Sequence, residues 1–232
     1  GRVFRDGEAG GRHNPEFTML EWYRLGMDHL RVADEAVELV QAALALVERR
    51  ASVARISFRE LYRDMLGVDP MTAGVDDLRA AAEGIAVDPE GLGRDDWLDL
   101  LMTHRIQPCF PPNQLLVLHG YPASQCALAK VVRRGDAEVA ERFELYLGPL
   151  ELANGYHELT DAVEQRRRFE RDVAVRSARG AASPPVDEAL LAAMGVGLPA
   201  CAGVALGIDR LLMAMLGTAR IADVLAFDFS RA

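Results

Sequence analysis

The segment RFELYLGPLELANGYHEL, residues 142–159, limits the possible folds more than any other part of the chain. It holds two runs of strand-forming residues separated only by Gly148 and Pro149, which are typical turn residues. So short a connection joins antiparallel neighbours, whereas parallel strands need a crossover of a dozen or more residues. The segment therefore predicts a β-hairpin and, with it, an antiparallel sheet.

Further strands and helices follow from the same kind of pattern. Residues 2–5 and 16–24 read as a hairpin with a long loop, and residues 113–122 read as another strand. Helices are expected where apolar residues recur at helical spacing, in 30–47, 57–66, 75–86, 94–105 and the later part of 203–217. Charged residues recur at this spacing in 159–179, and a further helix is expected from about 186 to the glycine that ends it. The prediction is one domain, 1–232, with an α+β fold: an antiparallel sheet flanked by helices, and a mostly helical insert at 26–110.

Composition excludes several classes of protein. Half of the 232 residues are hydrophobic, which suits a globular domain, and the net charge of −9 argues against a broad nucleic-acid surface. Three cysteines without a CxxC pair indicate a reducing compartment, and we expect a cytoplasmic protein. The apolar runs are too short to span a bilayer, so no membrane association is expected. The five histidines lack zinc-ligand spacing.

The opening hairpin carries a first candidate site. Side chains alternate along a strand, so Phe17, Met19, Glu21 and Tyr23 share one face. An aromatic ring, a carboxylate and a phenol suit a pocket floor better than a hydrophobic stripe, and Arg5 offers a fork for a phosphate. The alternative is a surface hairpin with a mixed face.

A second candidate lies in the hairpin at 142–159. Glu144 and Glu151 are on opposite arms, where they could face each other and hold Mg²⁺ together with phosphates. Glu158 has the opposite parity to Glu151, so a common site requires a β-bulge, expected near Asn154 and Gly155. The alternative is a solvated acidic edge.

The third candidate is the segment GVALGIDRLLMAML. Gly203 and Gly207 allow a close backbone approach to a ligand, and Arg210 stands at the start of a helix, where anions are favoured. The alternative is a helix-packing motif with a surface arginine.

Together these segments resemble the class II aminoacyl-tRNA synthetases. Arg5, His13, Phe17 and Glu21 match the second signature motif of the family, and ALGIDR, ending in Arg210, resembles the third. HNPEFTMLE resembles the lysine branch. RHNPEFTMLEWYR, YPASQ, ELANGYHELTDA, GVALGIDRL and IADVLAFDFSRA look like a truncated group within that branch, the elongation factor P–(R)-β-lysine ligases.

This resemblance implies an activity. ATP and lysine or (R)-β-lysine would form an aminoacyl-adenylate, and the acyl group would pass to a lysine of elongation factor P, with ATP and Mg²⁺ as cofactors and tRNA as an unlikely partner. Catalysis would consist of positioning and electrostatics. Two alternatives stay open: a catalytic fragment of a lysyl-tRNA synthetase that charges tRNA, and a non-catalytic paralogue.

The resemblance also implies residue roles. Arg5 would bind the α-phosphate, and Phe17 and Arg210 would enclose the adenine, so Arg5 and Arg210 are the expected catalytic residues. The expected ATP-binding set is Arg5, Gly7, Glu8, His13, Asn14, Phe17, Glu151, Leu152, Gly207 and Arg210; the expected amino-acid-binding set is Glu21, Tyr23, Ser124, Asn154, Tyr156, Glu158 and Ala205; and the expected Mg²⁺ ligands are Glu144 and Glu151.

Two positions depart from the synthetase pattern. Ala205 stands where the synthetases usually carry glycine, and its methyl group would reshape the amino-acid pocket in favour of (R)-β-lysine. Gly7 stands where the family has a glutamate, with Glu8 beside it, so that contact is either made by Glu8 or missing.

The first signature motif, which builds the dimer interface in this family, is not in the sequence. We therefore expect a fragment that lacks the N-terminal part of the fold, from an enzyme that is a homodimer at full length.

Overall fold

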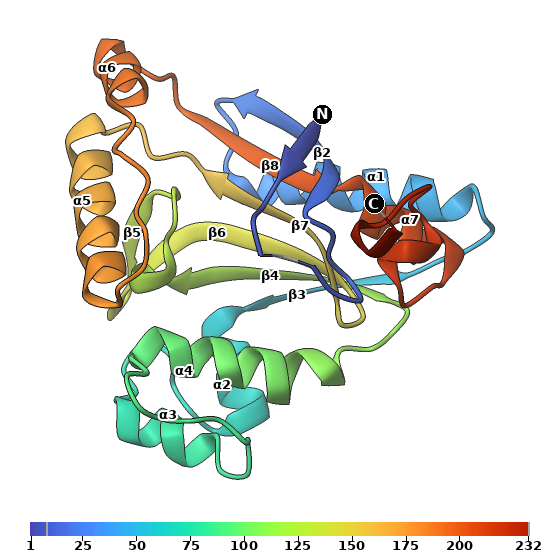
Figure 1. Cartoon of the computed structure of the whole chain (residues 1–232), viewed down its shortest axis with the longest axis horizontal. Helices are drawn as coiled ribbons and strands as arrows, with labels where there is room; N and C mark the ends of the chain where they lie inside the picture. The colour runs from blue at the N-terminus through green and yellow to red at the C-terminus, as the bar shows by residue number, and fades with distance from the viewer. Residues whose placement is uncertain (8, 232) are drawn as a thin grey trace.

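The computed structural model describes residues 1–7 and 9–231, which are built around one eight-stranded sheet (Figure 1). The strands are β1 (Arg2–Phe4), β2 (Glu16–Leu25), β3 (Ser52–Ser57), β4 (Gln114–Pro122), β5 (Val131–Arg134), β6 (Ala137–Leu147), β7 (Leu150–His157) and β8 (Cys201–Gly207). Their order is β1-β2-β8-β7-β6-β4-β3, with β5 also paired to β6. Every pair is antiparallel except β3 and β4, which are parallel. The predicted α+β fold with a mainly antiparallel sheet is confirmed.

Seven α-helices accompany the sheet in the described residues. They are α1 (His29–Ala45), α2 (Phe58–Leu66), α3 (Val75–Ala81), α4 (Arg94–Leu101), α5 (Ala162–Ala178), α6 (Glu188–Val196) and α7 (Ile208–Leu216). A π-helical turn, Met102–Ile106, continues α4. Each of these helices was expected from its spacing, although α3 is shorter than the predicted segment.

Three strands, β3, β5 and β8, do not follow from the sequence pattern. In β8, the pattern predicts the glycine-rich start of a helix at residues 203–207, but these residues pair on both sides, with β2 and with β7. The segment CAGVALG contains a single β-branched residue, so its propensity for a strand is low. Its small residues instead suit a central strand that has neighbours close on both sides.

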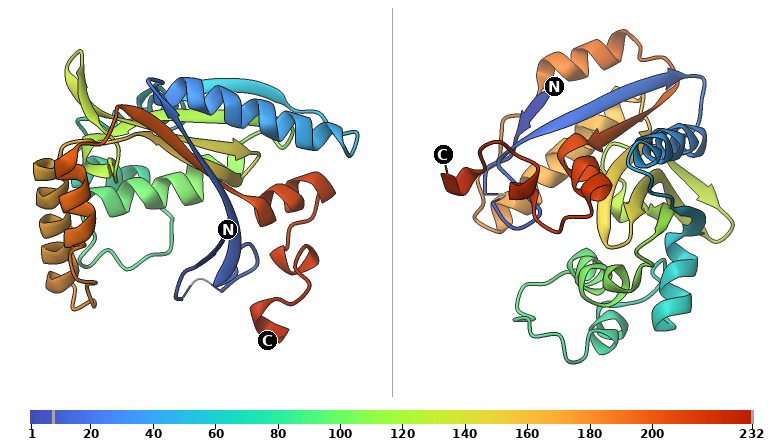
Figure 2. Two further views of the ribbon diagram at one scale, coloured as in Figure 1. Left: turned by 90° about the horizontal axis from the view of Figure 1, so that it is seen from above. Right: turned by 90° about the vertical axis from the view of Figure 1, so that its right-hand side faces the viewer.

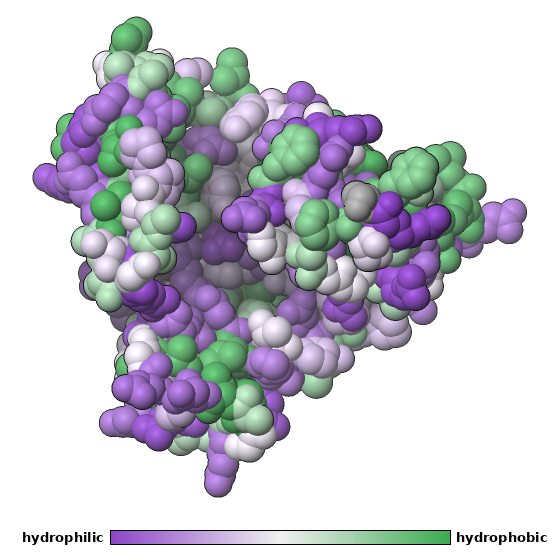
Figure 3. Space-filling model, in the orientation of Figure 1, coloured by the Kyte–Doolittle hydropathy of each residue, from purple (hydrophilic) through white to green (hydrophobic). Residues whose placement is uncertain are grey.

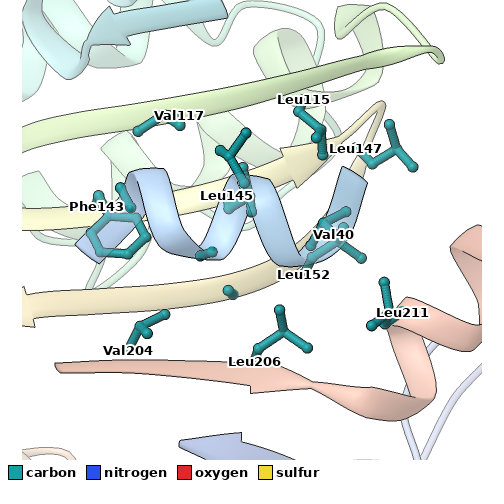
Figure 4. Close-up of a cluster of buried hydrophobic side chains, with 14 of the residues drawn as sticks. Val40, Leu115, Val117, Phe143, Leu145, Leu147, Leu152, Val204, Leu206 and Leu211 are labelled. Atoms are coloured by element: carbon teal, nitrogen blue, oxygen red, sulfur yellow. The ribbon is translucent and has the colours of Figure 1, made fainter. Parts of the chain in front are cut away.

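The stretch 26–110 is mostly helical but does not stand apart from the sheet. Helix α1 packs on the sheet, where Val40 joins a core with Leu145, Leu152 and Leu206 (Figure 4). Strand β3 extends the sheet beyond β4. Helices α2–α4 form the crossover that a parallel pair requires. The division into a domain and an insert stays a prediction.

Helices cover the two faces of the sheet unequally. One face is buried under α1 and α7, whereas α2–α4 cover only the part of the other face formed by β3, β4 and β6 (Figures 1 and 2). On that second face, the described helices leave the β2, β8 and β7 half open. Nowhere in residues 1–7 and 9–231 does a helix have the length and apolarity to cross a membrane.

Candidate active site

The open half of the sheet is the floor of a cleft of about 480 Å³. Its walls come from the loop between β1 and β2 and from the start of α7. Figure 3 shows this side of the molecule hollowed, with mainly hydrophilic residues in the hollow. The cleft brings together these expected residues: Arg5, His13, Asn14, Phe17, Glu21, Glu151, Leu152, Asn154, Tyr156, Ala205, Gly207 and Arg210.

Strand register places the floor residues in a row. Glu21 of β2 is paired with Ala205 of β8, which is paired in turn with Asn154 of β7 and, through it, with Glu144 of β6. Paired residues of neighbouring strands point to the same face. The methyl group of Ala205 therefore lies between the side chains of Glu21 and Asn154.

A second row lies beside the first and contains Tyr23, Gly203 and Tyr156. A Cβ atom at Gly203 would lie 2.5 Å from the Tyr23 ring and 2.8 Å from Oε1 of Glu158. Real Cβ atoms essentially never approach other atoms so closely, so any larger residue here would push Tyr23 or Glu158 out of its observed position. The phenol and the carboxylate consequently meet over Gly203, at the end of the open face.

Burial changes the acidity of these two groups. It raises the pKa of Glu158 from 4.5 to about 7, and the pKa of Tyr23 is also raised, mainly by burial and then by the charge of Glu158. A buried carboxylate without a permanent counter-charge is stabilised by a cationic partner. This end of the floor is suited to an ammonium group.

The β-bulge that the sequence predicted exists, but at a different residue. The pairing of β6 and β7 shifts between Leu145 and Tyr146, which face Ala153 and Glu151, so Leu152 is the extra residue. The expected position, Asn154 and Gly155, is regularly paired. The shift puts Glu151 on the same face as Asn154, because one added residue reverses the alternation of side chains.

The other end of the cleft is basic. The Arg5 guanidinium lies 5.4 Å from the centroid of the Phe17 ring. Arg210 donates to the Glu151 carbonyl at 3.0 Å, and its Nη2 lies 2.6 Å from Nε2 of His13. Arg12, which was not expected, also lines the cleft and donates to the Pro149 carbonyl at 3.3 Å. Arginines grouped in this way suit a phosphate chain.

The C-terminal segment supports this basic end. The backbone N–H of Ile221 donates to the Gly11 carbonyl at 2.8 Å, and that of Phe229 donates to Oδ1 of Asn14 at 2.9 Å. Ile221 itself lines the cleft, as do Ala153 and Asp209. The sequence offers no local signal for Ile221, because its role depends on packing between segments that are far apart in the chain.

Asp209 fixes the start of α7 against β2. Its Oδ2 accepts the Thr18 backbone N–H at 2.7 Å, and the residue is buried. The neighbouring Arg210 is thereby oriented toward the cleft. Asp209 directly precedes Arg210 in the segment ALGIDR, and that position beside an expected site residue is the one sequence signal that could have found it.

Glu144 and Glu151 form an acidic pair beside the cleft. Both line a second cavity of about 420 Å³ between the sheet and α4, and Glu151 also lines the main cleft. Burial and then the charge of Glu144 raise the pKa of Glu151 to about 7. Two carboxylates that repel each other fit a divalent cation. Since the described residues place no group of three or more histidine, cysteine, aspartate or glutamate side chains to hold a metal ion, phosphate oxygens and water would complete the coordination, as Mg²⁺ favours.

Of the expected residues that the structure describes, five are absent from the cleft lining: Tyr23, Glu158 and Glu144, which lie beside the floor, and Ser124 and Gly7. Ser124 donates to Oδ1 of Asp95 in α4 at 2.7 Å and is absent from the cleft lining. Gly7 adopts a φ of +77° in the loop and is also outside the lining. Glu8 lies outside the described residues.

Comparison with known proteins identifies the family. The sequence model of the tRNA synthetases class II (D, K and N) matches residues 1–231. The chain belongs to the class II tRNA synthetases. The expected fold is therefore confirmed at the level of the family.

Individual relatives show which group of class II synthetases this chain resembles. The chain is 44% identical over 236 residues to a protein of Salmonella dublin and 46% identical over 237 residues to one of Proteus mirabilis. Both are named "Elongation factor P--(R)-beta-lysine ligase". The matches cover 100% of this chain and 70% and 71% of the relatives, so the relatives are longer. The resemblance drawn from the sequence is confirmed.

Proposed function

We propose that this protein is an ATP-dependent ligase that activates (R)-β-lysine, or lysine, as an aminoacyl-adenylate and transfers it to a lysine side chain of elongation factor P. One observation carries the proposal: the cleft is basic at one end and acidic at the other. Arg5, Arg12 and Arg210 lie at the first end, and Glu21 is on the floor toward the second. The names of the relatives supply the acceptor.

The charges at the two ends orient the reactants. Phosphates of ATP bind the arginines, and Phe17 offers a ring for the adenine to stack on. The substrate's ammonium group binds near Glu158 and Tyr23, which places its carboxylate toward Arg5. In the activation step a carboxylate oxygen attacks the α-phosphorus, the bond to the bridging oxygen breaks, and pyrophosphate leaves.

Electrostatics then stabilise the transition state. Negative charge grows on the α-phosphate oxygens, and Arg5 is the expected donor to them. Mg²⁺ bound by Glu144 and Glu151 would neutralise charge on the departing phosphates. None of these residues has to act as a nucleophile, because the cleft works by holding the reacting groups in place.

In the transfer step the amine nitrogen of the acceptor lysine attacks the acyl carbon. An N–C bond forms, the C–O bond to AMP breaks with its electron pair leaving on AMP, and the acceptor ammonium releases two protons in total.

Labelled (R)-β-lysine and ATP, incubated with the protein and either elongation factor P or tRNA, test the proposal. We expect label on a lysine of elongation factor P. Label on tRNA alone would support the lysyl-tRNA synthetase alternative instead, and no amino-acid-dependent exchange of pyrophosphate into ATP would support the non-catalytic paralogue.

The family resemblance further leads us to propose a cytoplasmic homodimer. Light scattering after size-exclusion chromatography of the full-length protein measures the oligomeric state directly. A monomer at micromolar concentration would contradict the proposed homodimer.

A further inference from the structure

Arg142 is fixed beside the acidic pair by three contacts. It follows Glu141 in β6, on the same face as Glu144, and its Nη2 donates to Oε1 of Glu144. Its Nη1 donates to the Gln125 carbonyl at 2.9 Å, and its guanidinium lies 4.3 Å from the centroid of the Tyr121 ring. The side chain is only 18% exposed, so these contacts are made mostly away from water.

Glu144 is held from its other side by Tyr146, whose hydroxyl donates to Oε2. The two oxygens of the Glu144 carboxylate therefore accept hydrogen bonds from different side chains, which fixes the plane of the carboxylate. These two contacts orient Glu144 in the cavity that it shares with Glu151.

The neighbouring Glu151 makes this orientation costly to maintain. Two carboxylates that share a site repel each other, and one of them tends to turn away. Arg142 is a permanent positive charge at Glu144, since a guanidinium is not deprotonated in proteins. It offsets this repulsion on the Glu144 side.

We propose that Arg142 is a positioning residue that acts through Glu144, holding that carboxylate in its orientation beside Glu151 so that the pair binds a divalent cation. The inference rests on the proposed function, because it assigns the acidic pair to the cation that accompanies ATP. A competing structural role is that Arg142 only anchors the turn Ala123–Gln125 through the Gln125 carbonyl.

Mn²⁺ binding separates the two roles. Mn²⁺ is titrated into the purified protein and the free ion is measured by electron paramagnetic resonance, for the wild type, Arg142→Met, Arg142→Lys and Tyr146→Phe. Residues that orient metal ligands typically contribute roughly 10- to 100-fold to metal affinity, and we expect Arg142→Met to weaken Mn²⁺ binding by that factor. Arg142→Lys keeps the charge but not the fork, so its loss should be smaller.

Arg134→Met is the matched control. Arg134 also pairs with a glutamate of β6, Glu141, at 2.9 Å, but its side chain is 60% exposed and Glu141 is outside the acidic pair. The removal of Arg134 should leave Mn²⁺ binding unchanged. Thermal unfolding of every variant shows whether it is folded. If Arg142→Met does not fold, Arg142→Lys and Tyr146→Phe still test the positioning role, because each alters one contact to Glu144.

A double variant identifies the route of the effect. If Arg142 acts through Glu144, Arg142→Met should cause less than a twofold further loss of Mn²⁺ affinity in a Glu144→Gln background, because coupled residues are not additive. Additive losses, or an Arg142→Met protein that binds Mn²⁺ as the wild type does, would overturn the inference. Pyrophosphate exchange by the wild type is measured in parallel: its absence counts against the proposed function, whereas normal exchange with an unaltered Arg142→Met counts only against the positioning role.

Discussion

The Nη2 atom of Arg210 and the Nε2 atom of His13 lie 2.6 Å apart, although 197 positions separate the two residues. The contact closes the basic end of the cleft, because it joins the loop after β1 to the first turn of α7. Arg210 also donates to the carbonyl and the carboxylate of Glu151, at 3.0 and 3.4 Å. One guanidinium thus connects three elements around the proposed ATP site.

Arg210→Lys should therefore weaken the use of ATP. Lysine keeps the charge but cannot reproduce the planar fork, and hydrogen bonds to charged groups contribute about 1.5–3 kcal/mol, so kcat/KM for ATP should fall by about 10- to 100-fold. Pyrophosphate exchange at varied ATP concentration measures this.

Arg220→Lys is its control, since Arg220 is largely exposed and pairs only loosely with Asp223 at 3.8 Å. Equal effects of the two substitutions would mean that Arg210 has no special role in binding ATP.

Glu158 should give the reaction a pH dependence. Its raised pKa of about 7 means that the carboxylate is lost as the pH falls through 7. If the ionised form binds the substrate's ammonium group, KM for the amino acid should rise roughly tenfold between pH 8 and pH 6, following the ionised fraction. Glu158→Gln should raise KM at pH 8 and remove this dependence. A wild-type KM that does not change over this range would contradict the role of Glu158.

The raised pKa of Glu158 should also affect stability: the ionised carboxylate that favours substrate binding at high pH should make the folded protein less stable there. The pKa of Glu158 is higher in the folded chain, about 7, than its ordinary value of 4.5. The folded state then binds more protons than the unfolded state between these values, so this group makes the protein less stable as the pH rises from about 4.5 to 7. At pH 8, Glu158→Gln should unfold at a higher temperature than the wild type, and at pH 4 the difference should vanish. Calorimetry at both pH values measures it, and a lower unfolding temperature for the variant at pH 8 would contradict the burial argument.

The sequence predicts the parts of this molecule that depend on local pattern and fails where tertiary packing decides. The hairpin β6–β7 follows from Gly148 and Pro149, and the floor residue Glu21 follows from the alternation in β2. Strand β8 could not be predicted, because its small residues suit the side chains packed over it: a Cβ atom at Gly203 would lie 2.5 Å from the ring of Tyr23 in β2. The position of the bulge is also a tertiary property, because either Leu152 or Asn154 could have been the extra residue.

Long-range contacts explain the remaining differences at the site. Ile221 and Arg12 enter the cleft through contacts with distant backbone groups, which no local pattern encodes. Ser124 points instead to Asp95, on a helix whose place against the turn Ala123–Gln125 is fixed only by the fold. The motifs thus locate the ends of the cleft, but the fold decides which of their neighbours complete it.

Gly7 is best explained by its backbone. A φ of +77° lies in the left-handed region, where a non-glycine residue costs about 1–2 kcal/mol. Gly7→Glu should therefore lower the free energy of unfolding by about that amount without lowering KM for ATP. Urea unfolding and pyrophosphate exchange measure the two quantities. A marked drop in KM for ATP would instead mean that a glutamate contact had been missing from this loop.

Ala205 should control which lysine isomer is preferred. Its methyl group lies on the floor between Glu21 and Asn154, where the amino-acid chain of the proposed substrate passes. Ala205→Gly deepens the floor by one methyl group, and one such group changes binding by about 1–3 kcal/mol. We expect the ratio of kcat/KM for (R)-β-lysine to that for α-lysine to fall by about tenfold or more. Pyrophosphate exchange with each isomer measures this ratio.

Ala202→Gly is the matched control for this prediction. Ala202 lies in the same strand, but on the opposite face, fully buried in the core under α1. It should lose stability, since glycine in a strand costs about 0.5–1 kcal/mol relative to alanine, while its isomer ratio stays that of the wild type. If both variants shifted the ratio equally, the cause would be a loosened strand β8, and the methyl group of Ala205 would have no direct part in selecting the substrate.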